Sequence, residues 1–265
     1  MPWVEVQGTD VSCVEEGSGP PLLFLHGNSS CGEAWFQQFA ATRDRYHVIA
    51  HDSVNHGHSS NSPRDAEEPD RVDDLEGVIA ALGLVRPVIA GNSMGANTLL
   101  RWATRHPAEA TALIPSGMGI MDAGATAPRA PDPLAAETLF LPTGDSLTEG
   151  FKVAQPRMYE RYLRIRSTAT RIEALCHPRR PSARTLAERG ALDERAAAIR
   201  SPMLIVVGTL DRLLEPARRL HAAVAGSELV EIEGAPHNVY YEAAEAYNAA
   251  VARFLARVAA PAGAR

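Results

Sequence analysis

Ser93 lies in the segment VIAGNSMGA, residues 88–96, in which a short apolar run is followed by a Gly-x-Ser-x-Gly pattern and then by helix-forming residues. A serine on a sharp turn between a strand and a helix projects its hydroxyl away from the backbone. The helix N-terminus beside it offers unpaired N–H groups that favour negative charge. The flanking glycines are needed because side chains there would clash across the turn. The pattern predicts a nucleophilic serine, and the rest of the chain decides against the alternative, an ordinary Gly-Ser turn.

A nucleophilic serine needs a general base within hydrogen-bond reach and a carboxylate that orients this base. Asp211 follows an expected strand, and His237 lies in the loop after the next strand. Taken alone, each is typical of an ordinary turn carboxylate or loop histidine. Found in this order at strand ends, they predict Ser93 as nucleophile, His237 as general base and then acid, and Asp211 as the group that fixes the His237 tautomer. Asp122 is the one substitute for the acid, and it lies too far past its strand.

The oxygen that becomes negative during attack on a carbonyl needs preorganised N–H donors. The backbone N–H of Met94, directly after the nucleophile, is expected to provide one donor. The second is expected from Asn28, in the loop that follows an apolar strand ending at His26-Gly27. His26 itself is expected to hold that loop in place.

Short apolar strands alternate with helical segments along most of the chain, which predicts a mostly parallel sheet covered by helices on both faces. The expected strands are residues 4–7 and 11–15 (an N-terminal hairpin), 21–25, 47–51, 88–91, 112–115, 203–207 and 228–232. The expected helices are residues 31–43, capped by Ser29 or Ser30, and residues 71–82, 94–106, 216–225 and 240–258.

The alternation is interrupted between residues 120 and 199, where an Ala- and Pro-rich loop at 122–133 precedes helical spacing at 157–171. We therefore expect a core formed by residues 1–119 and 200–265, and a helical lid formed by residues 120–199 over the carboxyl ends of the strands. Residues 120–200 contain 13 basic and 10 acidic residues, whereas the whole chain has a net charge of −6. This balance is typical of a solvated helical surface, or else of inward-facing arginines that hold an anionic substrate.

Composition narrows the class of protein. The 265 residues are 45% hydrophobic and 22% charged, as in ordinary globular proteins, and the net charge argues against nucleic-acid binding. No apolar stretch is long enough to span a membrane, and no signal peptide is visible, so a cytoplasmic protein is expected. The three cysteines fit no disulfide framework, and His56 and His58 lack a third metal ligand, so we expect no metal and no cofactor. A small-molecule substrate is the expected partner, with a homodimer left open.

Five short motifs lie at or after the ends of expected strands: His26-Gly27, Asp52-x-x-x-His56-Gly57-His58-Ser59, Gly91-Asn92-Ser93-Met94-Gly95, Asp211-Arg212 and His237. Together they resemble the α/β-hydrolase superfamily over nearly the full chain. The resemblance implies the α/β-hydrolase fold, with a twisted sheet, flanking helices and a lid insertion. Asn55 stands where that superfamily usually has glycine, and asparagine also tolerates a positive φ. The serine nucleophile argues against epoxide hydrolases and haloalkane dehalogenases, which use aspartate there.

Within this superfamily, the meta-cleavage-product C–C hydrolases share the Gly-Asn-Ser-Met-Gly sequence. By that resemblance Asn92 contacts the substrate, and Arg161, with Arg164 one turn further on, matches a lid arginine that holds an anionic dienol. Asn238 departs from the aromatic residue that usually follows the histidine, and Asn28-Ser29-Ser30-Cys31 replaces a glycine-rich loop.

The sequence therefore predicts a hydrolase of a small carboxylic ester, thioester, lactone or activated C–C bond. A cofactor-free perhydrolase, or a lyase or cyclase of a tailoring pathway, is an alternative with the same triad. A small-molecule receptor built on this core is a third.

Overall fold

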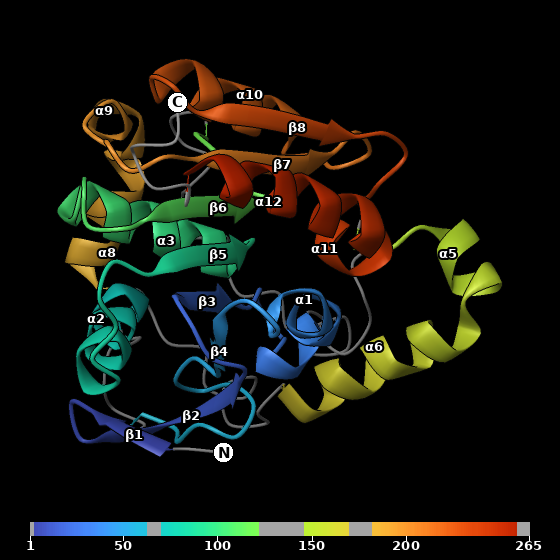
Figure 1. Ribbon diagram of the computed structural model, residues 1–265, viewed down its shortest axis with the longest axis horizontal. Helices are drawn as coiled ribbons and strands as arrows, with labels where there is room; N and C mark the ends of the chain where they lie inside the picture. Colours follow the sequence, from blue (N-terminus) through green and yellow to red (C-terminus); the bar gives the residue numbers. More distant parts are fainter. Residues whose placement is uncertain (1–2, 63–69, 122–145, 170–181, 259–265) are drawn as a thin grey trace.

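The computed structural model describes residues 3–62, 70–121, 146–169 and 182–258, and within them eight strands form one sheet (Figure 1). The strand order is β1-β2-β4-β3-β5-β6-β7-β8. The strands are β1 (Trp3–Val6), β2 (Thr9–Glu16), β3 (Pro21–Leu25), β4 (His47–His51), β5 (Val88–Asn92), β6 (Ala112–Ser116), β7 (Leu204–Gly208) and β8 (Glu228–Ile232).

The sheet is antiparallel only where β2 pairs with β1 and with β4, and its other strand pairs are parallel. Gln7 and Gly8, with φ of 51° and 76°, form the tight turn of the predicted N-terminal hairpin. The strands β5, β6 and β7 are buried along their whole length, as expected of central parallel strands that have helices on both faces. The predicted fold class is confirmed.

The helices are η1 (Gly32–Trp35, 3₁₀), α1 (Phe36–Thr42), α2 (Arg71–Ala81), α3 (Met94–Arg105), α5 (Glu149–Ala154), α6 (Pro156–Ala169), α8 (Ala183–Gly190), α9 (Leu192–Ala196), α10 (Leu214–Ala223), α11 (Val239–Glu242) and α12 (Ala244–Val258).

Alternate side chains of the strands serve two cores, one on each face of the sheet. Phe24 belongs to the core that also contains Trp35 of η1 and residues of α1, α11 and α12, whereas its neighbour Leu23 belongs to the core that contains residues of α2, α3, α9 and α10. This follows from the period of two in a β-strand. The larger aromatic groups gather on the first face, where Trp35 stacks between Phe24 and Tyr240.

Two predicted helices differ in the structure. The first begins at Gly32 as a 3₁₀ turn, and neither Ser29 nor Ser30 caps it: Cys31 is the N-cap residue, without a side-chain cap, and Ser29 has a φ of 54°. The Asp52 carboxylate instead accepts the Gly32 N–H at 2.7 Å. The C-terminal helix is interrupted at Ala243, whose φ and ψ of −104° and 42° are not helical, so α11 forms a separate turn directly after the loop that carries His237.

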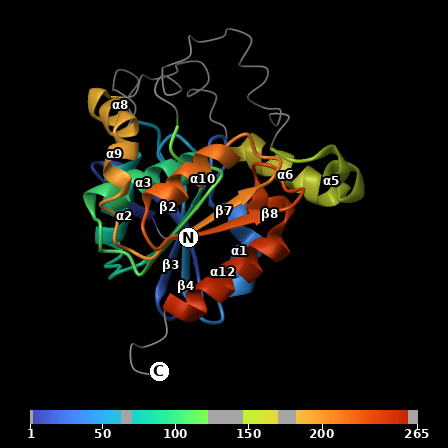
Figure 2. The ribbon, with the colours of Figure 1, turned by 90° about the horizontal axis from the view of Figure 1, so that it is seen from above.

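The described helices between β6 and β7 lie in two places. Seen from above, α5 and α6 lie on the opposite side of the sheet from α8 and α9 (Figure 2). Leu192 and Ala196 of α9 belong to the core shared with α3 and α10, so the chain has rejoined the core before residue 199. The predicted loop at 122–133, Asp122 and residues 170–171 of the predicted helix lie outside the described residues. The lid boundaries remain a prediction.

Candidate active site

Ser93 occupies a sharp turn between β5 and α3. Its φ of 53° and ψ of −111° are unfavourable for any residue that carries a Cβ atom. Backbone crowding explains the two flanking glycines. A Cβ added at Gly91 would lie 2.7 Å from the backbone of Gly95, and one at Gly95 would lie 2.2 Å from the carbonyl oxygen of Leu25. The turn therefore requires glycine at both positions.

Asp211 and His237 lie in the loops after β7 and β8, and the His237 Nδ1 atom is 3.0 Å from Asp211 Oδ2. The other carboxylate oxygen of Asp211 accepts the Leu213 N–H at 2.9 Å, and the Asp211 side chain is fully buried. An acceptor at Nδ1 favours the tautomer in which Nε2 is free to accept a proton. Gly208 brings the two loops together, because a Cβ there would lie 2.1 Å from the carbonyl oxygen of Ala235.

Ser93 and His237 line the same cavity, which has a volume of about 400 Å³. Most of its lining residues have polar side chains, and those that the structure describes include two arginines and no aspartate or glutamate. The chemistry-bearing members are Asn28, Asn92, Ser93, Tyr162, Arg166, Arg212, His237 and Asn238. A second cavity of about 360 Å³ also borders Ser93, where Met94, Met118, Met121 and Leu192 provide apolar surface beside two polar side chains, Asn97 and Arg189.

The two predicted oxyanion donors flank Ser93. Asn28 lines the first cavity and Met94 the second, and among the described residues neither backbone N–H donates a hydrogen bond to another protein group. His26 holds the Asn28 loop as predicted: its Nδ1 donates to the Gly27 carbonyl at 2.8 Å and its Nε2 accepts the Ser53 N–H at 2.9 Å. Burial lowers the pKa of His26, which keeps the ring neutral in this role.

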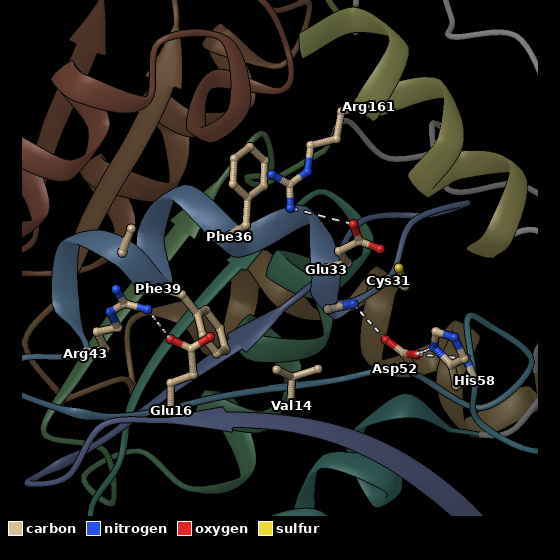
Figure 3. A pocket seen from close by; sticks show the side chains of 12 residues that line it. Val14, Glu16, Cys31, Glu33, Phe36, Phe39, Arg43, Asp52, His58 and Arg161 are labelled. Carbon is tan, nitrogen blue, oxygen red and sulfur yellow. Dashed lines mark hydrogen bonds and ion pairs between the residues drawn. The ribbon is translucent and has the colours of Figure 1, made fainter. Parts of the chain in front are cut away.

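The structure does not bring Arg161 or Arg164 to the cavity beside Ser93. The guanidinium of Arg161 lies over the ring of Phe36, 3.4 Å from its centroid, and its Nη2 atom is 3.6 Å from Glu33 Oε1. Both contacts lie in a separate cavity (Figure 3). Arg164 is exposed. The arginine of α6 that lines the cavity at Ser93 is Arg166. It lies four residues after Tyr162, on the buried face of the helix, and this spacing is the signal that sequence reasoning missed.

Asn92 lies where the sequence analysis placed it, directly before Ser93, and its amide is engaged within the protein. Its Nδ2 donates to Asn238 Oδ1 at 3.0 Å, and its Oδ1 accepts from Ser116 Oγ at 3.1 Å. Asn238 in turn donates to the Tyr162 hydroxyl at 2.7 Å. None of these partners was predicted, because they come together only when β5, β6, α6 and the His237 loop are assembled.

Within the described ranges, His, Cys, Asp and Glu side chains form no group of three that could hold a metal ion. His58 pairs with Asp52 through both its backbone N–H and its ring. None of the helices that the structure describes is both long and apolar enough to span a bilayer.

The chain resembles known proteins in both sequence and fold. Residues 22–250 match the alpha/beta hydrolase family. The chain is 28% identical to a 2-(acetamidomethylene)succinate hydrolase of Mesorhizobium japonicum, over 95% of this chain and 94% of that protein. It is 40% identical over 81 residues, 31% of each chain, to an (E)-2-((N-methylformamido)methylene)succinate hydrolase of Acinetobacter baylyi. The fold matches that of an enol-lactonase from Burkholderia xenovorans with a TM-score of 0.76 and 21% identity, over 96% of this chain and all of that one.

The family match covers both the strand-turn-helix unit around Ser93 and the loops that carry Asp211 and His237. It confirms the resemblance found in the sequence motifs. The chain therefore belongs to the alpha/beta hydrolase family, and the protein is an enzyme of the hydrolase class.

Proposed function

We propose that this enzyme hydrolyses a small carboxylate-bearing substrate, an ester, lactone, amide-like or activated C–C compound, with Ser93 as nucleophile. One observation carries the proposal. Ser93, on a strained turn, shares an arginine-containing cavity with His237, and the Nδ1 atom of His237 is within hydrogen-bond distance of Asp211. A serine, a base and an orienting carboxylate are the three groups that acyl transfer requires.

In the proposed reaction, Ser93 Oγ attacks the substrate carbonyl while His237 Nε2 accepts the hydroxyl proton. Asp211 keeps the Nδ1–H of His237 in place and stabilises the imidazolium that forms. The backbone N–H groups of Asn28 and Met94 receive the negative carbonyl oxygen. His237 then delivers the proton to the leaving group, and water, activated by the same histidine, releases the acid from Ser93.

The acidic part of the substrate is proposed from the two arginines of the cavity. Arg166 and Arg212 line it, and a guanidinium matches the geometry of a carboxylate. The 28% identical relative is named for a substituted succinate, a compound with two carboxylates, which supports the same substrate class. The second cavity at Ser93 offers the apolar surface of three methionines and Leu192 to the rest of the substrate, beside the polar groups of Asn97 and Arg189.

Labelling with a neutral fluorophosphonate tests the nucleophile. We expect the wild type to be labelled and Ser93→Ala to remain unlabelled. Equal labelling of the two proteins would overturn the proposal.

The substrate class is tested with two 4-nitrophenyl esters of equal chain length, the monoester of adipate and the ester of hexanoate. Arg166→Leu should lower the ratio of kcat/KM for adipate over hexanoate by roughly 10- to 100-fold, the range for one hydrogen bond to a charged group. Arg257→Leu, which removes an exposed arginine of α12, should leave the ratio unchanged. An unchanged ratio in Arg166→Leu would exclude this residue as the anion anchor.

A further inference from the structure

Asn238 is the N-cap residue of α11, yet its side chain does not cap this helix. An asparagine in that position normally accepts a backbone N–H of the first helical turn. Asn238 is 8% exposed, and its side chain is turned away from α11 towards other elements. A favourable local hydrogen bond is thus given up for contacts elsewhere.

Those contacts join three parts of the molecule. The Asn238 Oδ1 atom accepts from Asn92 at the end of β5, at 3.0 Å, and its Nδ2 donates to the Tyr162 hydroxyl of α6, at 2.7 Å. Its backbone N–H donates to the Ser146 carbonyl at 3.2 Å, in the chain that leads into α5. Asn238 therefore connects the strand before Ser93, the loop of His237 and the helices near the cavity.

The connection to Asn92 matters because of the sheet order. The strands β5 and β8 are separated by β6 and β7, so no direct backbone ladder joins the strand before the His237 loop to the strand before the Ser93 turn. Neighbouring strands are about 4.8 Å apart, which separates these two strand axes by about 14 Å. The His237 loop must reach back over this span to bring its histidine to the cavity at Ser93.

The Asn92 end of this connection is rigid. Its Oδ1 accepts from Ser116 of β6, and a Cβ added at Gly117 would lie 3.1 Å from that oxygen and 3.0 Å from His237 Cε1. Asn92 is 1% exposed. A hydrogen bond to such a fixed group restrains Asn238, and with it the covalently adjacent His237.

We propose that Asn238 is a positioning residue for Ser93 and His237, a role that rests on the function proposed above. Through Asn92 it holds His237 in register with Ser93. Through Tyr162 it links the position of His237 to that of α6, so that a movement of this helix also moves the reacting groups.

The experiment replaces Asn238 with serine, which retains an N-cap side chain for α11 but is too short to reach both Asn92 and Tyr162. The rate of labelling by a neutral fluorophosphonate and the kcat for 4-nitrophenyl hexanoate should both fall by roughly 10- to 100-fold, as expected for a small misplacement of a reacting group. KM should stay at the wild-type value, because the loss is confined to the transition state. The unfolding midpoint should fall, since two buried hydrogen bonds are lost, but the variant should remain folded at the assay temperature, which circular dichroism checks.

Tyr162→Phe removes one of the two side-chain bonds and should cause a smaller fall in the labelling rate. Added to Asn238→Ser, it should cause no further loss, since both changes act through one connection. Asn248→Ser is the matched control: it removes a hydrogen bond with Gln38 in α1, and its labelling rate should equal that of the wild type.

Wild-type labelling in Asn238→Ser would overturn the positioning role, and so would a loss of rate that merely follows a loss of folded protein. Additive losses in the double variant would refute the tie to α6. Labelling that persists in Ser93→Ala would instead refute the proposed function.

Discussion

The backbone conformation of Ser93 predicts that replacing this residue by alanine or by glycine will have different effects on the stability of the protein. Ser93→Ala and Ser93→Gly both remove the hydroxyl, so both are expected to lose activity. Alanine keeps the Cβ atom that makes a φ of 53° with a ψ of −111° unfavourable, whereas glycine does not. Only the glycine variant relieves the strained turn.

The expected size of the difference follows from two opposing effects. A residue held in such a sparsely populated conformation costs on the order of 1–3 kcal/mol. Glycine gains flexibility in the unfolded chain, which offsets about 0.5–1 kcal/mol of that relief. The free energy of unfolding of Ser93→Gly should therefore exceed that of Ser93→Ala by roughly 1 kcal/mol, and at most by about 2.5 kcal/mol. For a chain of this size, about 1 kcal/mol corresponds to a rise in Tm of about 2–4 °C.

Urea unfolding followed by circular dichroism, with a thermal scan of the same samples, measures this difference. Ser167, exposed within α6, provides the control pair. There the order should reverse, with the glycine variant about 0.5–1 kcal/mol less stable than the alanine variant, as in any helix interior. If Ser93→Gly is no more stable than Ser93→Ala, the strain argument for the turn at Ser93 is refuted.

Three further predictions concern buried charged groups. Asp211→Asn should lower kcat by about 10³–10⁴-fold with little change in KM, because the tautomer of His237 is no longer fixed. Steady-state kinetics with 4-nitrophenyl hexanoate measures this loss, and a loss below tenfold would argue against the role proposed for Asp211. Burial raises the pKa of Asp74 from 3.8 to about 7. The folded state then binds more protons than the unfolded state between these values, so stability should fall as pH rises through that window. Asp74→Asn should remove this dependence and gain up to roughly 4 kcal/mol at pH 8, a gain that equal urea midpoints of variant and wild type at pH 8 would exclude. Arg101 is 2% exposed and forms a hydrogen bond with Asp70. Arg101→Ala should lower the free energy of unfolding, measured with urea, by about 3–5 kcal/mol, because the substitution leaves the buried carboxylate of Asp70 with fewer partners.

The groups at strand ends could be predicted from sequence because parallel strands end at one edge of the sheet. Ser93, Asp211 and His237 each follow a recognisable apolar strand, so their proximity needed no knowledge of packing. Helix faces are different. Arg161 and Arg166 stand on the same helix, and the four-residue spacing from Tyr162 places only Arg166 on the face of that tyrosine. The packing of α6 against the core decides that this face borders the cavity.

Hydrogen bonds between side chains far apart along the chain could not be predicted from the sequence either. Asn238 could be recognised as a departure from the related hydrolases, but its partners Asn92 and Tyr162 lie 146 and 76 residues away along the chain. The same holds for the start of η1, where the carboxylate of Asp52 performs the capping that a nearby serine was expected to perform. Such replacements depend on loop conformations that propensities do not describe.

The crowding around Gly91, Gly95 and Gly208 has a consequence for how such an enzyme can diversify. These positions are held by contacts between backbone atoms, which no side chain can reproduce, so mutation has almost no freedom there. Parts of the walls of the two cavities beside Ser93 are instead formed by side chains outside the proposed catalytic and positioning groups, such as Arg166 of α6, Arg189 of α8 and Leu192 of α9. Selection can exchange these side chains and so change which compounds are accepted, while the backbone of the Ser93 turn stays the same.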